Sequence, residues 1–185
     1  PNPQHPQAAT LTRGERPDRL KARSSLDPQA DSPPPTPNPP KVDKFMQAAI
    51  EEARKGARAG GIPIGSVLVK DGEIVARGHN KRVQELDPVL HAEIDCLRNG
   101  GRVGSYRDTV LYSTLMPCYL CAGAVVQFKI PKVVAGESRT FPGTRAFMES
   151  HGIEVVDLDL SECVEMMEKF ISENPALWFE DIGEL

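Results

Sequence analysis

The sequence predicts an α/β domain of three layers, in which a mixed sheet of five strands lies between helices. Two apolar, strand-like segments flank Asp71-Gly72, a dipeptide typical of the tight turn in an antiparallel hairpin. After this hairpin, strand patterns alternate with helical patterns, which is typical of strands joined by helical crossovers. A hairpin followed by crossovers gives a sheet that contains both antiparallel and parallel neighbours.

The beginning of the chain differs in composition from the rest. Residues 1–41 are rich in Pro, Ser, Gln, Asn and Arg, and the run from Ser32 to Pro40 is mostly proline. Proline fixes φ and removes a backbone donor, so such a run sustains neither a helix nor a central strand. We therefore predict a disordered extension over residues 1–41 and one folded domain over residues 42–185.

The elements of the folded domain follow from hydrophobic periodicity and from residues that start or stop helices. Asp43 is a suitable cap for a first helix, which Gly60-Gly61 ends. Pro117 precedes a helix over 118–128, and Ser161 is a suitable cap for a helix over 161–173. The five expected strands are residues 64–69, 74–78, 110–114, 132–136 and 154–158. The other expected helices are residues 91–98, 141–151 and 175–183.

The most informative pattern is His91-Ala92-Glu93, followed by Pro117-Cys118-Tyr119-Leu120-Cys121. It offers one imidazole and two thiols to a metal, whereas a structural zinc site usually has four protein ligands. A Zn²⁺ held by His91, Cys118 and Cys121 would keep one position for a water, whose pKa zinc lowers to about 7. Glu93 is then the expected catalytic proton shuttle. The order of these residues matches the known signature of zinc deaminases.

The remaining cysteines and histidines are expected to have structural roles. Cys96 and Cys163 lie on apolar helical faces and are expected to be buried. His79 and His151 are expected to be structural or surface residues rather than ligands. A single C-x-x-C also occurs in redox pairs and zinc knuckles, so a structural zinc that holds an interaction module stays open as a reading from a different class. In that reading the proline-rich segment would be a ligand for partner domains.

Composition and charge restrict the partners. The chain has 185 residues, a formal net charge of −4 and a pI of about 5.6, whereas contacts to nucleic-acid phosphates need clustered Lys and Arg. No apolar run approaches the ~20 residues that span a membrane. Four cysteines, two of them in the metal pattern, favour a reducing compartment over a disulfide framework. We expect neither nucleic acid nor membrane as a partner, and a cytoplasmic location with the nucleus as a second one.

Beyond the zinc pattern, nearly all of residues 42–185, and none of the preceding extension, resembles the fungal cytosine deaminases. The similar segments are Gly61-Ile62-Pro63-Ile64-Gly65, His79-Asn80-Lys81-Arg82, Leu90-His91-Ala92-Glu93, Leu111-Tyr112-Ser113-Thr114-Leu115-Met116-Pro117-Cys118 and Trp178-Phe179-Glu180-Asp181-Ile182-Gly183-Glu184. The last of these is the most specific. The resemblance implies a cytidine-deaminase-like fold, one Zn²⁺ per chain and a homodimer. It also implies hydrolysis of free cytosine to uracil and ammonia, a reaction of pyrimidine salvage.

The resemblance also implies contacts to the base, position by position. Asn80 and the backbone N–H of Ala92 would bind the O2 edge, Asp181 would accept the N1 proton, and Glu93 would meet N3. The carbonyl of Met116 would meet the leaving amine, although the family has Ser at this position. The ring would be enclosed by Ile64, Leu115, Phe141 and Trp178. Because a nucleoside has no N1–H, a buried acceptor at Asp181 would select the free base.

Two other enzymes stay open as alternatives. A tRNA adenosine deaminase resembles this chain at the Pro-Cys-x-x-Cys helix and also takes a base into a zinc pocket. The acidic charge of the chain and the segment over 178–184 argue against it. A deaminase of another small amino-heterocycle, such as guanine, is the second alternative. Glu180, next to the expected N1 acceptor, is expected to face solvent.

Overall fold

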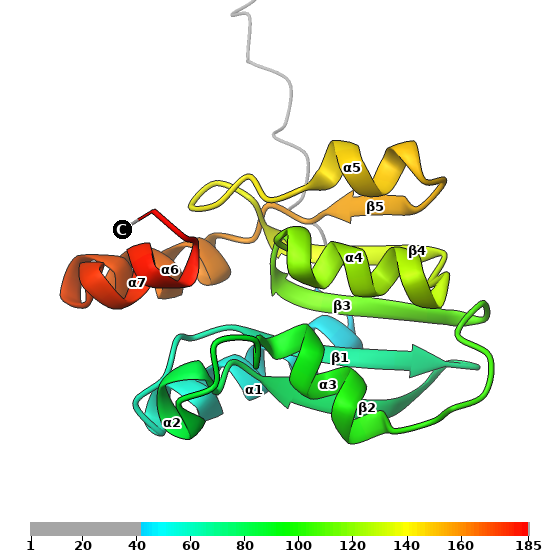
Figure 1. Ribbon diagram of the computed structural model, residues 1–185, viewed down its shortest axis with the longest axis horizontal. Helices are drawn as coiled ribbons and strands as arrows, with labels where there is room; N and C mark the ends of the chain where they lie inside the picture. Colours follow the sequence, from blue (N-terminus) through cyan, green and yellow to red (C-terminus); the bar gives the residue numbers. More distant parts are fainter. Residues whose placement is uncertain (1–41, 185) are drawn as a thin grey trace, which may run out of the picture. The chain divides into compact units, whose positions relative to one another are not determined.

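A computed structural model describes residues 42–184, which form a five-stranded sheet with the order β2-β1-β3-β4-β5 (Figure 1). β1 (Gly65–Lys70) pairs antiparallel with β2 (Glu73–His79) and with β3 (Thr109–Leu115). β4 (Lys132–Glu137) and β5 (Glu154–Asp157) continue the sheet in parallel. The predicted mixed sheet is confirmed. The predicted extension over residues 1–41 lies outside the described residues.

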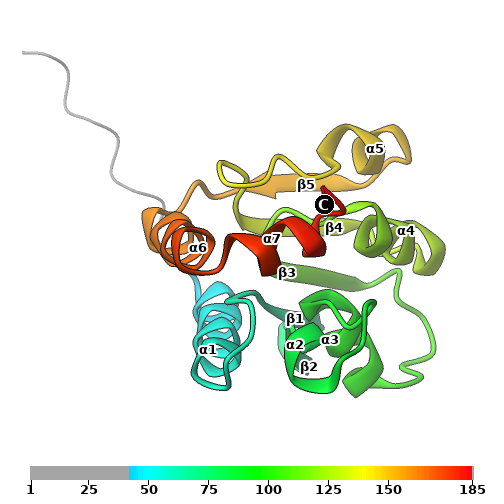
Figure 2. The ribbon, with the colours of Figure 1, turned by 60° about the vertical axis from the view of Figure 1, so that its left-hand side comes forward.

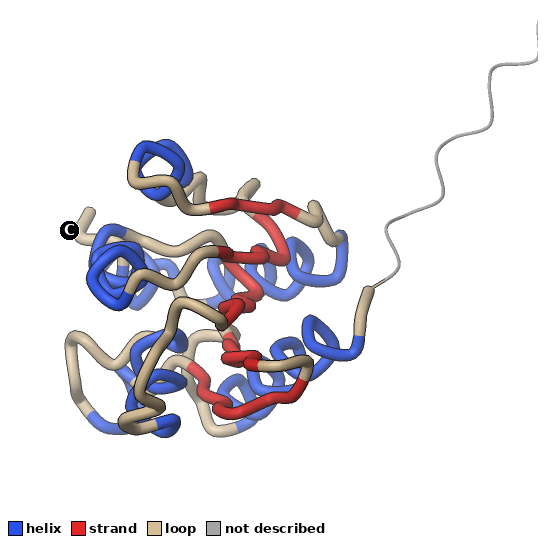
Figure 3. The backbone as a smooth tube through the Cα atoms, turned by 90° about the vertical axis from the view of Figure 1, so that its right-hand side faces the viewer, coloured by secondary structure: helices blue, strands red, loops and turns tan. Residues whose placement is uncertain are grey.

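Helices cover both faces of the sheet, as Figure 3 shows. One face packs against α1 (Lys44–Arg58) and α6 (Ser161–Glu173), and the core there includes Met46, Val67 and Cys163. The opposite face packs against the helices that hold the metal-ligand pattern, with Cys96, Leu111 and Val125 in its core. The helices on that side are α3 (Ala92–Gly100), α4 (Tyr119–Phe128) and α5 (Arg145–Ser150). This arrangement is the predicted three-layer architecture, and both Cys96 and Cys163 are buried as expected.

The local signals for the first helix and the hairpin are confirmed. The Asp43 carboxylate accepts hydrogen bonds from the backbone N–H groups of Phe45 and Met46, at 3.0 and 2.8 Å, and so caps α1. Asp71 and Gly72 have φ values of 51° and 76°, the left-handed conformation that a tight hairpin turn requires.

Besides shifts of one or two residues at the ends of other elements, the helices differ from the prediction in four places. A single-turn helix, α2 (Arg82–Glu85), was not predicted. α5 begins at Arg145 rather than at 141, because the chain turns at Gly143, which has a φ of 59° and follows Pro142. The cap residue of α6 is Leu160 rather than Ser161. The last helix, α7 (Pro175–Asp181), ends before residue 183.

Glycine allows α3 to lie directly on the sheet. A Cβ atom at Gly78 in β2 would lie 2.3 Å from the backbone nitrogen of Cys96, a distance that no side chain tolerates. Gly65 in β1 meets α1 in the same way, with 2.1 Å to the carbonyl oxygen of Ala49. These contacts fix the distance of both helices from the sheet, and α3 carries the first part of the metal pattern.

The helices between residues 42 and 184 are all too short or too polar to cross a bilayer. α7 follows α6 directly and lies beyond one end of the strands (Figure 2). This position brings the last described segment of the chain to the same end of the sheet as the start of α4, where the site is found.

Candidate active site

The metal-ligand pattern lies at the N-termini of two helices. His91 is the N-cap residue of α3, and Cys118 is the N-cap residue of α4. Both have extended backbone, and in the described chain neither side chain caps its own helix. Cys121 lies in the first turn of α4 and faces the same point. The positive ends of the two helix dipoles favour thiolates at this place.

The three side chains have the spacing of zinc ligands. The nitrogen and sulfur ligand atoms of His91, Cys118 and Cys121 all lie within 4.8 Å of one another. His91 Nδ1 lies 3.5 Å from Cys118 Sγ. Tetrahedral zinc with ordinary Zn–N and Zn–S bonds places its ligand atoms about 3.5–3.8 Å apart, so this donor set fits the metal.

The two thiols have opposite acidities. A hydrogen bond from Cys121 and another with His91 lower the pKa of Cys118 to about 4, against the effect of burial. The hydrogen bond to Cys118, together with burial, raises the pKa of Cys121 well above its ordinary value. Burial opposes charge on His91, but the hydrogen bond to Cys118 and nearby negative charges raise the pKa of its imidazole. Metal binding must therefore displace the proton of Cys121.

Glu93 is held between the metal ligands and the sheet. The side chain is almost completely buried, and Glu93 Oε1 accepts a hydrogen bond of 2.9 Å from the Ser113 hydroxyl on β3. Glu93 Oε2 lies 3.2 Å from Cys121 Sγ. Burial and the charge of Cys118 raise the pKa of Glu93. A carboxyl group with a raised pKa beside a metal site can both take up and return a proton near neutral pH.

A small cavity adjoins these groups. Its free volume is about 20 Å³, which is room for about one water. The rings of Phe141 and Trp178 meet edge to face at 6.0 Å, and Trp178 is only 4% exposed. The lining residues are Ile64, His91, Ala92, Glu93, Leu115, Met116, Cys118, Phe141, Trp178, Asp181 and Ile182. Every residue predicted for the site is in this set except Asn80 and Cys121.

Those two residues join the site from behind its walls. Cys121 does not line the cavity, but its Sγ lies 3.2 Å from Glu93 Oε2 and close to the ligand atoms of His91 and Cys118. Asn80 is fully buried, and its side-chain nitrogen donates to Asp181 Oδ1 at 3.4 Å. Asp181 Oδ1 also lies 3.8 Å from His91 Nε2, the ring nitrogen that faces away from Cys118. A carboxylate behind a ligating histidine orients its ring and strengthens its bond to a metal.

Sequence reasoning missed three residues of the site. The Arg82 guanidinium donates to Asp181 Oδ1 at 2.8 Å, Ser113 orients Glu93, and Ile182 lines the cavity. All three stand inside the segments that carry the family resemblance. No local pattern distinguishes them, since their contacts depend on segments far apart in the sequence. Glu180 is half exposed as expected, but it also pairs with Arg82 at 3.2 Å.

Comparisons with known proteins agree with this geometry. The family model for the cytidine and deoxycytidylate deaminase zinc-binding region matches residues 39–137. The cytosine deaminase of Candida albicans is 42% identical over 144 residues, which cover 76% of this chain and 96% of that protein. A tRNA-specific adenosine deaminase of Streptococcus pyogenes is 36% identical over 138 residues, which cover 68% of this chain and 87% of that protein.

A solved structure from a study of tRNA A34 deaminases shares the fold. It matches with a TM-score of 0.59 and 30% identity, over 66% of this chain and 97% of that one. The matched family region contains every zinc ligand and Glu93. Since both the family model and close relatives cover the site, the chain is a zinc-dependent deaminase and belongs to the cytidine and deoxycytidylate deaminase family.

Proposed function

We propose that this protein is a cytosine deaminase that hydrolyses the free base to uracil and ammonia. The observation that carries the proposal is the position of Asp181, which lines the small cavity together with Trp178 and has 5% of its side chain exposed. A buried carboxylate there matches a base that has an N–H to offer, and rejects one that carries a ribose at that nitrogen. The identity to the Candida albicans cytosine deaminase supports the same substrate.

The side chains suit the proton transfers of this reaction. Bound zinc supplies an acidified water as the nucleophile for C4 of the ring. Glu93 takes one proton of that water and gives it to N3, and then passes the remaining proton of the added water to the amine, which leaves as ammonia while C4 becomes a carbonyl carbon. The hydrogen bond from Ser113 leaves Glu93 Oε2 as the oxygen that faces Cys121 and the metal position.

Backbone and side-chain groups would orient the ring. The backbone N–H of Ala92 and the amide of Asn80 serve the O2 edge, and Asp181 accepts the N1 proton. The carbonyl of Met116 receives the amine, and the Met116 side chain is buried at 1% exposure. A backbone carbonyl is supplied by any residue, so the loss of the family's Ser at this position leaves the contact intact.

Entry of the base requires the cavity to open. A pyrimidine does not fit into a space for one water, so part of the wall must move. α7 supplies Trp178 and Asp181 and is a short helix at the edge of the fold. We infer that α7 opens to admit the base and closes to exclude water from the reaction.

The second candidate is a tRNA adenosine deaminase, which the 36% identity to the Streptococcus pyogenes protein favours. An RNA-linked base carries its ribose on a ring nitrogen and has no N–H there, so it leaves the buried Asp181 carboxylate in this cavity without the donor that a free base supplies. A guanine-type substrate is the third candidate. A structural zinc site needs no proton shuttle, so the buried Glu93 beside the metal ligands argues against a structural-zinc module.

A homodimer would cover the outer face of α4. The exposed apolar side chains on this helix are Tyr119 at 73%, Leu120 at 43% and Phe128 at 42%. A helix that is apolar on both its inner and outer faces is usually buried on both. We propose that a second copy of the chain packs there.

We also propose that residues 42–185 form the catalytic domain of an enzyme of pyrimidine salvage. Its proposed location is the cytoplasm and the nucleus.

Ammonia release tests the substrate. Zinc-loaded protein is given cytosine, cytidine, guanine or an anticodon stem-loop RNA, with the Glu93→Gln variant as the background control. We expect turnover of cytosine alone. Turnover of the RNA without cytosine would establish the adenosine deaminase, and turnover of guanine alone would establish the third candidate. Zinc binding without turnover of any substrate would favour the structural module.

A further inference from the structure

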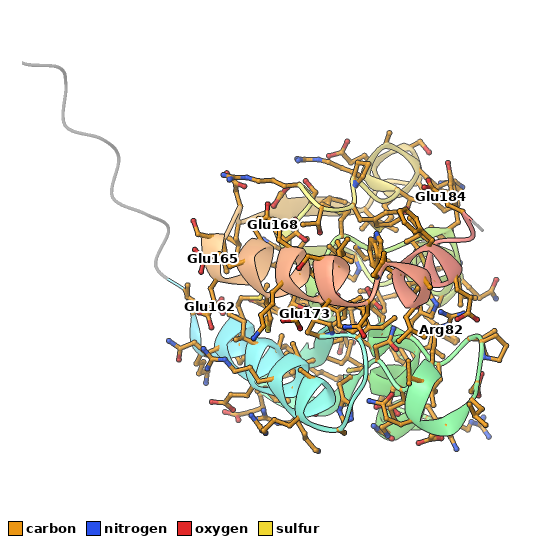
Figure 4. All side chains as sticks on the ribbon, turned by 90° about the vertical axis from the view of Figure 1, so that its left-hand side faces the viewer. Arg82, Glu162, Glu165, Glu168, Glu173 and Glu184 are labelled. Atoms are coloured by element: carbon orange, nitrogen blue, oxygen red, sulfur yellow. The ribbon has the colours of Figure 1, made fainter. Side chains whose placement is uncertain are left out.

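Arg82 connects the wall of the cavity to the base-reading residues. It is the first residue of α2, and only 9% of its side chain is exposed. Its guanidinium uses three nitrogens: Nη1 donates to Asp181 Oδ1 at 2.8 Å, Nη2 to Glu180 Oε1 at 3.2 Å, and Nε to the Pro88 carbonyl at 3.0 Å. Figure 4 labels Arg82 where the segment after β2 meets α7.

The backbone of the same residue holds the second polar group of the site. The Arg82 N–H donates to Asn80 Oδ1 at 3.1 Å. Asn80 in turn donates from its side-chain nitrogen to Asp181 Oδ1 at 3.4 Å. One residue therefore fixes the amide of Asn80 and the carboxylate of Asp181, which come from segments about a hundred residues apart.

These contacts all fall on one oxygen of Asp181. Within residues 42–184, Arg82, Asn80 and His91 approach Oδ1, and no side chain donates a hydrogen bond to Oδ2. Asp181 lines the cavity, so Oδ2 is the oxygen left to meet a ligand. A guanidinium has only donors, and its planar fork fixes the orientation of the group that it binds.

We propose that Arg82 is a positioning residue that determines base specificity, because it holds Asp181 with one oxygen occupied and the other directed at the ring N–H of the base. The inference rests on the proposed deamination of cytosine. Without Arg82, the Asp181 side chain loses its charge-assisted hydrogen bond and the orientation that this bond imposes. The variant enzyme should keep its metal and its proton shuttle but lose its preference for a base with N1–H.

A tether for α7 is the competing explanation, because Arg82 also pairs with Glu180. The two ion pairs differ in burial, since the side chain of Glu180 is 52% exposed and that of Asp181 is 5% exposed. An exposed pair contributes little, so Glu180→Gln is a matched control that removes one contact of Arg82 and leaves Asp181 in place.

The test compares cytosine with 1-methylcytosine in full-length, zinc-loaded wild-type, Arg82→Gln, Arg82→Lys and Glu180→Gln proteins. For Arg82→Gln we expect kcat/KM for cytosine to fall about 10- to 100-fold, the cost of a lost hydrogen bond to a charged group. The value for 1-methylcytosine should change far less, so that the ratio between the substrates collapses. In Arg82→Lys the ratio of kcat/KM for cytosine to that for 1-methylcytosine should lie between the values for Arg82→Gln and wild type. In Glu180→Gln this ratio should equal the wild-type value. Inhibition constants of uracil and 1-methyluracil give the same comparison without turnover.

Several results would overturn the inference. If Arg82 were only a structural tether, Arg82→Gln would lower kcat/KM for cytosine and for 1-methylcytosine by the same factor. Glu180→Gln would then also lower kcat/KM. If Arg82→Gln fails to fold, as judged by zinc content and thermal melting, an unchanged ratio in a folded Arg82→Met protein, which keeps the apolar stem and has no donor, would refute the role. A wild-type protein that does not deaminate cytosine would remove the proposed function as well. Wild-type turnover with an unchanged ratio in the variants would overturn the role of Arg82 alone.

Discussion

Replacing Ser113 by alanine removes the hydroxyl that holds Glu93, and leaves the metal ligands untouched. Ser113 is fully buried, and its hydrogen bond of 2.9 Å to Glu93 Oε1 is the contact that the sheet provides to the proton shuttle. A hydrogen bond to a charged group contributes about 1.5–3 kcal/mol, which corresponds to about 10- to 150-fold in rate if the whole contribution is lost in the transition state. We therefore expect kcat to fall within this range.

The sheet offers a matched control for this variant. Ser66 on β1 is paired directly with Ser113 on β3, is equally buried, and donates to the Tyr112 carbonyl at 2.7 Å. Ser66→Ala should cost the same order of stability, about 1–3 kcal/mol, with kcat unchanged. The assay is steady-state ammonia release at saturating cytosine, with zinc content and thermal unfolding measured on each protein. Wild-type kcat in zinc-loaded Ser113→Ala would refute the reasoning, as would an equal loss of kcat in both variants.

Three further predictions address the metal, the dimer and the fold. Zinc affinity should fall about tenfold or more per pH unit as the pH is lowered, because binding displaces the proton of Cys121, whose pKa is raised, and also that of His91 wherever its imidazole is charged; chelator competition at several pH values measures the slope, and a flat profile would contradict it. Leu120→Lys on the outer face of α4 should give a monomer by analytical ultracentrifugation, whereas Leu86→Lys, at an 89% exposed leucine elsewhere, should not. Lys129 ends α4 with a φ of 60°, so Lys129→Gly should raise stability by about 1 kcal/mol in thermal unfolding; an unchanged or lower midpoint would count against it.

Local sequence signals were sufficient for the parts of the fold that depend on neighbours in the chain. The hairpin followed from Asp71-Gly72, and the first helix followed from the cap at Asp43, because both are decided within a few residues. The metal cluster could also be predicted, since its residue types and spacing restrict the chemistry so strongly. The resemblance, rather than periodicity, suggested the walls of the cavity.

The features that sequence reasoning missed depend on contacts over long distances. The N-cap residue of α2, Lys81, makes no capping hydrogen bond, and the side chains of this single turn are held by tertiary partners, such as Asp181 for Arg82 and the Gly56 carbonyl for Gln84. Similarly, the helical pattern from Phe141 onward was interrupted by Pro142-Gly143. Phe141 instead lies in a loop that closes the cavity.

The order of the site residues along the chain has a consequence for synthesis. His91 and Cys121 are both made well before Asp181, which lies in α7 near the end of the described residues. The ribosome extends the chain from its N-terminal side, at about 5–20 residues per second. A nascent chain therefore gains the atoms that bind zinc before it gains the carboxylate that reads the base. Premature termination between these points would leave a polypeptide that has all three ligand residues but lacks Asp181.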